Sequence, residues 1–569
     1  MGRKKKRYKT GSITPVRGKP GASLPSVRIP AWRAGLPWIC LGLILLFVVA
    51  VRIRLLPVPL ERDEGEYAYA GQLILEGIPP YQLAYNVKFP GIYAAYALVM
   101  AVFGQTPSGI HLGLLVVNLG AIVLLFSLAR RLFDSYAAVI ASATYALMST
   151  SNAVMGLRAH ATHFVIVAAL GGFVLLLRGL ESRRALTLFW SGLLFGVAVL
   201  MKQHGVFLGV FAFGVLVYNE WLSKIAANSA GSSAGSVQDP GTDAKKSLLP
   251  GLRRVAAFSF GTVVPYALAC LVLWRTGAFK NFWRWTVLYA SGHSLPYTFQ
   301  GLARNFQDNG PDNFFWGLGV AGFFLLCADR SVPGWTKGFV GGLLASSFIA
   351  VSLGFYFFPH YFVLMLPALA LLVGAGCTLA GQKLRQSGLG TLGVFLPAAV
   401  FLVGSGWVLK SPRTDWIESY VSFDAAPALA SYISNHSTPA SRIAVFGSEP
   451  EIYFYAHRHA AAGYIYMYDI TSASAHADEM KREMLREVEA ARPEFVVDVH
   501  DRFSWSVGFF SPETQRIHDW LEQYLKSGNY QRVAVAENVN GKIVYRWNSD
   551  AADYSPASES YICVYQRKL

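Results

Sequence analysis

The segment LERDEGEYAYAGQLILEGIPPYQLAYNVKFPG, residues 60–91, follows directly after the first long apolar run of the chain. It gathers many ionisable residues among aromatic residues and prolines, including Arg62, Asp63, Glu64, Glu66 and Lys88. Unpaired charges are costly inside a bilayer, so such a crowd is expected where the chain leaves it. The segment therefore points to a polar site at the surface of a membrane-embedded chain.

The composition predicts a polytopic α-helical membrane protein. Of 569 residues, 53% are hydrophobic and only 15% are charged, whereas soluble domains carry about 25% charged residues. The formal net charge of +16 fits loops that face anionic lipid, so we expect membrane lipids and no nucleic acid among its partners. The five cysteines form no C-x-x-C pair, which argues against a disulfide framework or a thiolate metal site.

Apolar runs long enough to cross a bilayer recur between the N-terminus and residue 409. They predict about eleven transmembrane helices, at 36–56, 108–129, 135–151, 160–178, 185–201, 205–222, 255–275, 312–328, 337–355, 360–380 and 388–409. The shorter run 91–104 begins with Pro-Gly and is expected to lie at the interface, within a first outer loop at 57–107. The distribution of Lys and Arg places the basic tail 1–33 in the cytoplasm and the first outer loop outside it.

The composition becomes that of a soluble domain after residue 409. RIAVFGS (442–448) and EFVVDVH (494–500) are typical of buried strands, whereas DEMKREMLREVEAA (478–491) and SPETQRIHDWLEQYL (511–525) are typical of amphipathic helices. This alternation predicts a transmembrane domain at 34–409 followed by an α/β domain at 410–569. An odd number of spans puts the α/β domain outside the cytoplasm.

Two motifs in the opening segment resemble a known family. Asp63-Glu64 is followed by Tyr67, and Lys88-Phe89-Pro90-Gly91 opens the interfacial run. This arrangement resembles the lipid-phosphate-dependent glycosyltransferases of the GT-C superfamily, and within it the protein O-mannosyltransferases and lipid A aminoarabinose transferases (glycosyltransferase family 39-like). Members carry an acidic pair, often Asp-Glu-x-x-Tyr, and further along the loop Lys-Pro-Pro or a variant. Phe89 departs from that pattern.

Further segments extend the resemblance over most of the chain, in the order in which such segments stand in the family: ARRLFD (129–134), LRAHATHF (157–164), LMKQHG (200–205), FPHYFVLMLPALALL (358–372) and VFGSEPEIYFYAHR (445–458). The resemblance implies an enzyme with a GT-C fold that transfers a sugar from a polyprenyl-phosphate donor to an acceptor outside the cytoplasm. The acceptor would be an envelope glycan, a glycolipid or a protein. A single displacement, and hence inversion at the anomeric carbon, is also implied.

The chemistry of this reaction assigns roles to the acidic pair. The phosphate of the donor, with a second pKa of about 6, departs as an anion without a strong general acid. The acceptor hydroxyl must lose a proton, and a carboxylate base contributes roughly 10²–10⁴ to the rate. We therefore expect Asp63 to be the general base and Glu64 a second catalytic residue that binds a metal, a sugar hydroxyl or a cation. No cofactor is firmly indicated, and a divalent cation, with Glu64 as its candidate ligand, stays open.

Cations at the outer ends of spans are candidates for binding the donor phosphate. They are Lys88, Arg158, Lys202 and His360, joined by Tyr67 of the acidic motif. The chain contains neither a G-x-x-x-x-G-K-[ST] loop nor a dinucleotide-binding fingerprint, so a nucleotide donor is not expected.

Simpler roles compete with each assignment. The acidic pair could be solvated, or could cap a helix that begins near Gly65. Lys88 could extend to the interface, and His360 could be an ordinary packed histidine. Glu66 is expected to be structural and paired with Arg62. His160 and His163 lack further ligands in the sequence, so a histidine metal site is not favoured.

Two other classes of protein are alternatives to the enzyme. A transporter or lipid flippase would carry ionisable residues at the midplane of paired repeats. The predicted spans have few central charges, and we find no matching halves. A non-catalytic partner in envelope assembly would not need the acidic pair. We therefore predict an integral protein of the bacterial plasma membrane, with its active site outside the cytoplasm.

Overall fold

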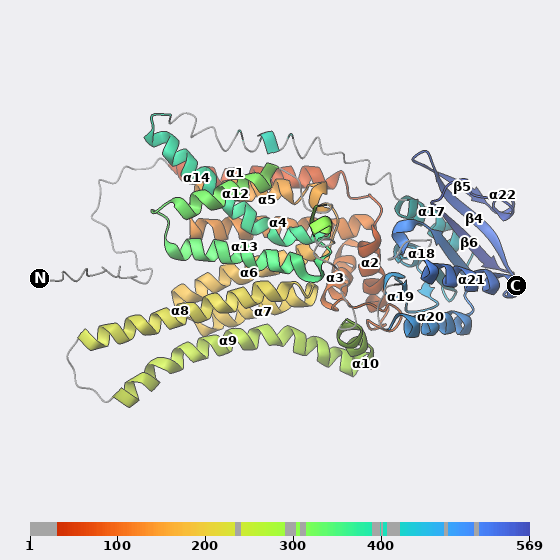
Figure 1. The fold of residues 1–569 in the computed structure, drawn as a ribbon, viewed down its shortest axis with the longest axis horizontal. Coiled ribbons are helices and arrows are strands. Elements are labelled where there is room, and N and C mark those ends of the chain that lie inside the picture. Colours follow the sequence, from red (N-terminus) through yellow and green to blue (C-terminus); the bar gives the residue numbers. More distant parts are fainter. Residues whose placement is uncertain are drawn as a thin grey trace, which may run out of the picture.

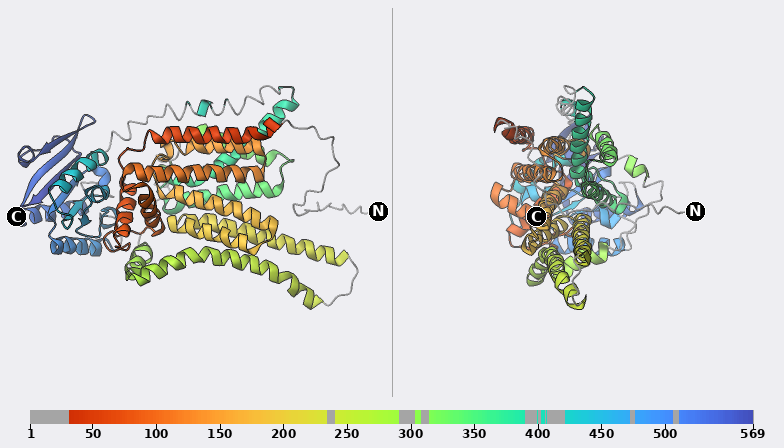
Figure 2. Two further views of the ribbon diagram at one scale, coloured as in Figure 1. Left: turned by 180° about the vertical axis from the view of Figure 1, so that it is seen from behind. Right: turned by 90° about the vertical axis from the view of Figure 1, so that its left-hand side faces the viewer.

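The computed structural model describes residues 31–233, 240–290, 303–307, 314–389, 399, 402–404, 406, 421–471, 476–505 and 511–568. A bundle of long helices lies beside a smaller domain that contains a sheet, and the helices α2 and α3 lie at the junction (Figure 1). The other views agree that the bundle helices run along the long axis of the molecule, away from the sheet (Figure 2).

The bundle helices coincide with the predicted spans from 36–56 to 360–380. They are α1 (Ala31–Ile53), α4 (Pro107–Leu132), α5 (Ser135–Met148), α6 (Ala161–Ser182), α7 (Ala185–Met201), α8 (Gly205–Ser233), α9 (Pro240–Arg275), α12 (Phe314–Ala328), α13 (Gly334–Ser352), and η4 (Pro359–Met365) continuing into α14 (Leu366–Gln386). Short elements join them: η1 (Asn152–Val154), α10 (Phe279–Trp283), η2 (Arg284–Tyr289) and η3 (Leu353–Phe355). The predicted span 388–409 lies almost wholly outside the described residues.

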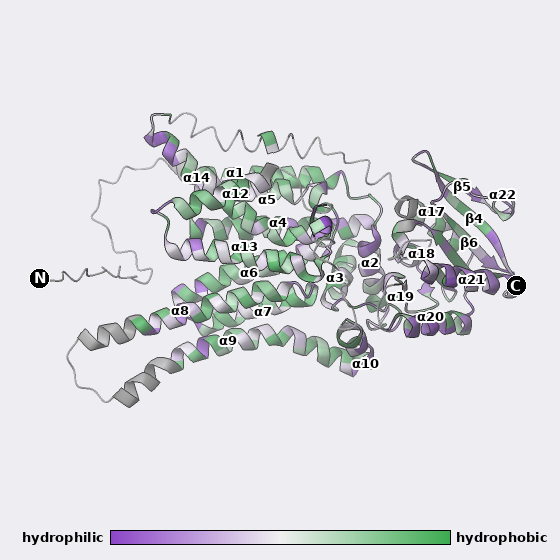
Figure 3. Ribbon diagram, viewed as in Figure 1, coloured by the Kyte–Doolittle hydropathy of each residue, from purple (hydrophilic) through white to green (hydrophobic). Residues whose placement is uncertain are grey.

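The protein is an integral membrane protein. Within the described part of the chain, 7 helices are long and apolar enough to cross a membrane, and shorter apolar helices of 10–17 residues accompany them. The bundle is predominantly hydrophobic along its length, whereas α20 and α21 of the smaller domain are strongly hydrophilic (Figure 3). The polytopic helical fold class predicted from composition is therefore confirmed.

Glycines let α7 and α9 approach closely. A Cβ atom built on Gly192 would lie 2.0 Å from the carbonyl oxygen of Phe258, and one on Gly196 would lie 2.3 Å from that of Thr262. Gly261 on α9 makes the reciprocal approach to the carbonyl oxygen of Phe189, at 2.1 Å. Small residues are the usual means by which helices pack in lipid, where hydrophobicity does not drive helices together.

The segment predicted to be the first outer loop, 57–107, contains two helices, α2 (Arg62–Leu75) and α3 (Gly91–Phe103). Helix α2 begins at Arg62, three residues earlier than predicted. Glu61 is its N-cap, and Glu61 and Glu64 exchange backbone and side-chain hydrogen bonds as a capping box. Gly91 at the start of α3 packs against the end of α7, where an added Cβ would lie 2.6 Å from the carbonyl oxygen of Leu200.

The smaller domain has a mixed sheet of order β2-β1-β3-β6-β4-β5. Strand β1 (Arg442–Phe446) pairs in parallel with β2 (His459–Ala460) and β3 (Phe495–His500). Strands β4 (Tyr530–Val539), β5 (Lys542–Trp547) and β6 (Tyr561–Arg567) form an antiparallel half that joins β3 through β6. The helices are α17 (Val421–Asn435), α18 (Glu451–Ala456), α19 (Tyr468–Thr471), α20 (Ala477–Ala491), η5 (Arg502–Ser504), α21 (Pro512–Ser527) and α22 (Ser549–Ala552).

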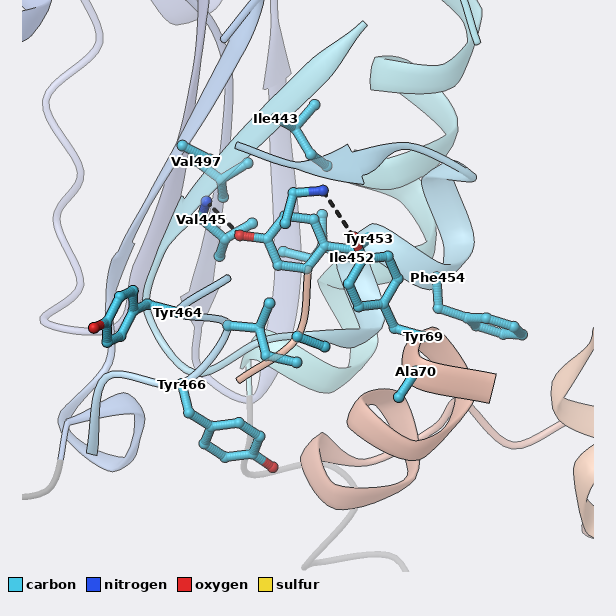
Figure 4. Packing of buried hydrophobic residues seen from close by; sticks show 14 of the residues in the cluster. Tyr69, Ala70, Ile443, Val445, Ile452, Tyr453, Phe454, Tyr464, Tyr466 and Val497 are labelled. Carbon is cyan, nitrogen blue, oxygen red and sulfur yellow. Dashed lines mark hydrogen bonds between the residues drawn. The ribbon is translucent and has the colours of Figure 1, made fainter. Parts of the chain in front are cut away.

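Helix α2 docks directly on this domain. The Tyr69 and Tyr453 rings stack with centroids 5.1 Å apart, and the Tyr69 hydroxyl accepts a hydrogen bond from the Ala460 backbone N–H at 2.8 Å (Figure 4). Tyr453 in turn accepts from the Val445 N–H at 2.9 Å. Gly65 permits the contact, because a Cβ atom there would lie 2.5 Å from Cβ of Glu451. The segment of 60–91 is thus held between the bundle and the sheet.

Candidate active site

A pocket of about 480 Å³ lies at the junction of the bundle and the sheet domain. Its polar wall comes from the start of α2, the segment before α6, and η4. Apolar side chains from the segments that follow α1 and η1, together with aromatic side chains of the sheet domain, complete it. The lining residues that the site uses are Leu55, Arg62, Asp63, Met155, Leu157, Arg158, His160, Phe358, His360, Tyr466, Tyr468 and Phe503.

Asp63 is the carboxylate on the pocket wall. Its Oδ1 accepts hydrogen bonds from Lys88 Nζ at 2.7 Å and from the Tyr466 hydroxyl at 3.1 Å. Its Oδ2 lies 3.6 Å from His160 Nδ1 and 3.8 Å from His360 Nε2. Burial by itself would raise the pKa of Asp63, but Lys88 and His160 hold that pKa well below its usual range. Asp63 is therefore ionised and fixed in orientation, with a side chain that is 21% exposed.

Lys88 lies between two carboxylates. Its Nζ donates to Asp63 and, at 2.5 Å, to Oε2 of Glu66. The ammonium also lies 4.7 Å from the centre of the Tyr67 ring and 5.3 Å from that of Tyr466. Glu66 is buried and accepts a second hydrogen bond from Tyr93 at 2.6 Å. The expected pairing of Glu66 with Arg62 is wrong, because the nearer ammonium of Lys88 takes that place.

Glu64 points away from Asp63, into the interior. Its Oε1 accepts from the Ala159 N–H at 2.5 Å and lies 3.1 Å from His111 Nε2, while Oε2 accepts from the Glu61 N–H. Burial would raise the pKa of Glu64, but His111 and Arg158 lower it to about 2. Adjacent residues of a helix differ by about 100° in direction. The side chains of Asp63 and Glu64 therefore point to different surroundings. Glu64 holds the segment before α6 in place.

Two histidines face Asp63. The rings of His160 and His360 stack with centroids 4.1 Å apart and planes 11° apart. Donor atoms of Asp63, His160 and His360 lie within 4.8 Å of one another. Two imidazole nitrogens and a carboxylate oxygen suit zinc and related divalent ions. The residues that could hold a cation are therefore these three, rather than Glu64 as the sequence suggested.

The other two predicted cations lie on different sides of the site. Arg158 lines the pocket, donates to the carbonyl oxygen of Pro59 at 2.7 Å and lies 3.7 Å from Glu64. Lys202 Nζ lies 3.5 Å from His360 Nε2 and 4.1 Å from the centre of the Tyr361 ring. Burial lowers the pKa of Lys202 to about 7, although Asp63 opposes the shift. Lys202 is thus a half-buried amine whose pKa lies close to neutrality.

The sheet domain completes the site. Arg62, next to Asp63, donates to Glu449 at 2.7 Å and to the Phe503 carbonyl oxygen at 2.6 Å, and it also donates to Tyr468. Ser504 donates to the other oxygen of Glu449 at 2.7 Å. Tyr466 contacts Asp63 itself. Two segments of the sheet domain, 466–468 and 503–504, therefore position the first turn of α2.

Comparison with known proteins agrees with this architecture. A family model described as dolichyl-phosphate-mannose-protein mannosyltransferase matches residues 88–234. The crystal structure of ArnT from Cupriavidus metallidurans in the apo state superposes with a TM-score of 0.56 and 16% identity, over 94% of this chain and 98% of that one. The chain has the GT-C fold. This confirms the resemblance inferred from the order of the motifs.

The chain is also similar to two further solved structures. ArnT from Cupriavidus metallidurans bound to undecaprenyl phosphate gives a TM-score of 0.54 at 15% identity, over 93% of this chain and 98% of that one. The archaeal oligosaccharyltransferase AglB from Archaeoglobus fulgidus gives 0.49 at 13% identity, over 91% and 75%. No curated protein sequence matches the chain.

Sequence reasoning missed two residues of this candidate site. His160 stands in LRAHATHF, a segment that the family resemblance had singled out. The sequence suggested only His163 as its partner, whereas its partners are Asp63 and His360. His163 is buried inside α6, whereas His160 caps that helix and faces Asp63. No local pattern marked Tyr466, because it contacts Asp63 from 403 residues further along the chain. Tyr67 and Lys88 lie behind Asp63 and are not among the pocket-lining residues of the described chain.

Proposed function

We propose that the protein is a membrane glycosyltransferase that moves a sugar from a polyprenyl-phosphate donor to an acceptor outside the cytoplasm. The observation that carries this proposal is an ionised carboxylate, Asp63, fixed on the wall of a pocket at the end of a GT-C bundle. The family model over 88–234, whose description names a dolichyl-phosphate sugar, supports it. So does the presence of undecaprenyl phosphate on ArnT.

The proposed reaction is one displacement at the anomeric carbon. The acceptor oxygen forms a bond to that carbon, the bond from the carbon to the phosphate oxygen breaks, and polyprenyl phosphate leaves with the electron pair. The proton of the acceptor hydroxyl passes to Asp63, which is already ionised. One displacement inverts the anomeric configuration. Lys88 and Tyr466 hold Asp63 Oδ1, which leaves Oδ2 as the proton acceptor on the side of the histidines.

The pocket offers separate surfaces to the phosphate and the prenyl chain. Arg158, His360 and, beside His360, Lys202 supply positive charge or hydrogen-bond donors for the phosphate. Leu55, Met155, Leu157 and Phe358 supply an apolar wall that suits the prenyl chain. The acceptor would enter beside Tyr466 and Tyr468 of the sheet domain, which we place outside the cytoplasm with the domain boundaries predicted above.

An enzyme accounts for the charges better than a transporter does. The acidic and basic side chains of the pocket belong to Glu61 and the start of α2, to the first turns of α4, to the segment before α6 and to the start of η4, all at the end of the bundle that adjoins the sheet domain. A transport site would lie near the middle of the bundle. Sugar transfer at the membrane surface needs charged side chains at the end of the bundle, which is where they lie.

The direct test follows sugar transfer by purified protein from polyprenyl-phosphate sugars to envelope glycans, glycolipids and proteins. Asp63→Asn keeps the shape of the side chain but removes its basicity, and turnover should fall roughly 10²-fold or more. Glu76→Gln is the matched control, because Glu76 follows the same helix and pairs with His459 at the surface. Near-native turnover by well-folded Asp63→Asn would show that the base lies elsewhere.

A further inference from the structure

A second group of metal-ligating side chains lies in the sheet domain, separate from the pocket. Asp498 and His500 come from β3, and His518 comes from α21. Asp498 Oδ2 lies 2.8 Å from His500 Nε2, and Asp498 Oδ1 lies 3.3 Å from His518 Nδ1. One donor atom from each of the three residues lies within 4.8 Å of the others. Asp498 is only 7% exposed.

The fold brings these residues to one face of the sheet. Asp498 and His500 are two residues apart on a strand, so their side chains point to the same side. Directly opposite on β6 are Cys563 and Tyr561. Helix α21 covers this face, where Trp520 contacts Phe446, the β1 residue paired with Asp498. His518 of α21 is thereby held over the end of β3.

Aromatic rings fix both imidazoles. The His500 ring stacks on Tyr561, with centroids 4.2 Å apart and planes 13° apart. The His518 ring lies 5.0 Å from Trp505 and 5.1 Å from the His500 ring. Groups that hold ligand rings in place raise the affinity of metal sites, because less freedom is lost when the ion binds.

We propose that Asp498, His500 and His518 form a zinc site, with a water molecule in the fourth position. Ligand atoms at about 2.0–2.2 Å from a tetrahedral zinc ion lie about 3.3–3.6 Å from one another. The 3.3 Å between Asp498 Oδ1 and His518 Nδ1 matches that spacing, whereas the 2.8 Å hydrogen bond between Asp498 Oδ2 and His500 Nε2 must lengthen to admit the ion. The ion would join β3 to α21.

This position connects the zinc site to the active site through the backbone. The segment directly after β3 carries Phe503, whose carbonyl oxygen accepts from Arg62, and Ser504, which donates to Glu449. Zinc at the end of β3 would hold this segment where it supports α2. The role is structural, and it does not depend on the reaction proposed above.

The test measures zinc bound by the full-length protein in detergent. Protein stripped with a chelator is dialysed against ZnCl2, and zinc is counted by mass spectrometry and titrated against a competing dye. His518→Ala should lose one equivalent of tightly bound zinc, with an affinity loss beyond the 10–100-fold that outer-shell changes cause. His436→Ala, which changes the histidine directly after α17 in the same domain, should keep that equivalent. So should His360→Ala, which removes a donor of the Asp63 group.

X-ray absorption at the zinc edge gives a second readout that needs no variant. The native protein should show about two imidazole ligands per zinc at this site, and zinc should raise the midpoint of thermal unfolding in native protein but not in His518→Ala. Equal zinc content in native and His518→Ala proteins would overturn the proposal. So would a native protein that binds no zinc, because Asp498 would then be only a hydrogen-bond acceptor for the two histidines.

Discussion

At the scale of single residues, the charge of the site depends on Lys88, which pairs with two carboxylates at once. Lys88 contacts both Asp63 and Glu66, so it is already neutralised by carboxylates before any substrate arrives. The sequence suggested that Lys88 binds the donor phosphate. Its position behind Asp63 gives it a different expected role, which is to keep Asp63 ionised.

Replacing Lys88 tests that role through pH. Lys88 lowers the pKa of Asp63, whereas burial raises it. In Lys88→Met the pKa of Asp63 should therefore rise, and the acid limb of the kcat/KM profile should move upward by at least about one pH unit. Lys88→Arg keeps the charge and should move it less. An unshifted acid limb, together with weakened binding of undecaprenyl phosphate, would return Lys88 to the phosphate.

Lys202 gives an independent prediction about donor binding. Its pKa of about 7 means that its ammonium is lost as pH rises through neutrality. Between pH 6 and 8, native protein should therefore lose affinity for undecaprenyl phosphate relative to Lys202→Met, which has no charge to lose. Lys202→Arg stays charged over this range and should not show the loss. Binding measured by calorimetry across the pH series compares the three proteins, and parallel curves for native and Lys202→Met would contradict the role.

Because of Lys202, the free energy of unfolding should also rise with pH above neutrality. The pKa of Lys202 is lowered on folding from 10.5, so the unfolded chain binds more protons between pH 7 and 10.5. The cost of burying the charge is full below pH 7 and is relieved as pH rises toward 10.5. Lys202→Met should therefore flatten the rise in stability across that window in thermal unfolding measurements.

At the scale of elements, the close packing of α7 on α9 depends on glycine. Gly192→Ala would place a Cβ atom 2.0 Å from the Phe258 carbonyl oxygen, so the helices must separate. We expect a loss of about 1–3 kcal/mol in the free energy of unfolding, seen as a lower melting temperature in detergent.

Gly214→Ala on α8 is the matched control. Nothing lies within 4 Å of a Cβ atom there, and alanine favours helix over glycine. Its melting temperature should be unchanged or slightly higher. Equal losses for Gly192→Ala and Gly214→Ala would mean that the approach of α7 to α9 does not limit stability.

At the scale of the whole molecule, the sheet domain is part of the site because Arg62 and Glu449 join it to α2. Both side chains are buried, at 10% and 0% exposure. Breaking such a pair from one side leaves an uncompensated charge and costs about 3–5 kcal/mol. Glu449→Ala should therefore loosen the two domains, increase hydrogen exchange in 503–504 and lower turnover.

A second ion pair across the same contact is the control for that experiment. His459 and Glu76 also join the sheet domain to α2, but they are 34% and 41% exposed. Such a pair contributes about 0–1 kcal/mol, so His459→Gln should change neither hydrogen exchange nor turnover appreciably. If Glu449→Ala behaves like His459→Gln, the sheet domain does not position Asp63.

The sequence by itself determined the elements of this protein. Apolar runs define the bundle helices because lipid leaves the backbone no partner outside a helix. The parallel strands β1 and β3 were visible as short apolar runs between amphipathic helices. The antiparallel strands β4, β5 and β6 were not predicted, although Asn540-Gly541, both with positive φ, is a recognisable hairpin turn. The acidic pair and the resemblance together indicated where a site would lie.

Only the tertiary structure decided which groups meet at that site. The direction of Glu64 away from Asp63 follows from a helix that begins at Arg62, and such boundaries are poorly encoded locally. The partners of Asp63 come from four separate parts of the chain: Lys88, His160, His360 and Tyr466. Charge, burial and hydrogen bonding act through space, so the lowered pKa values of Asp63 and Lys202 arise only once the bundle and the sheet domain have packed together.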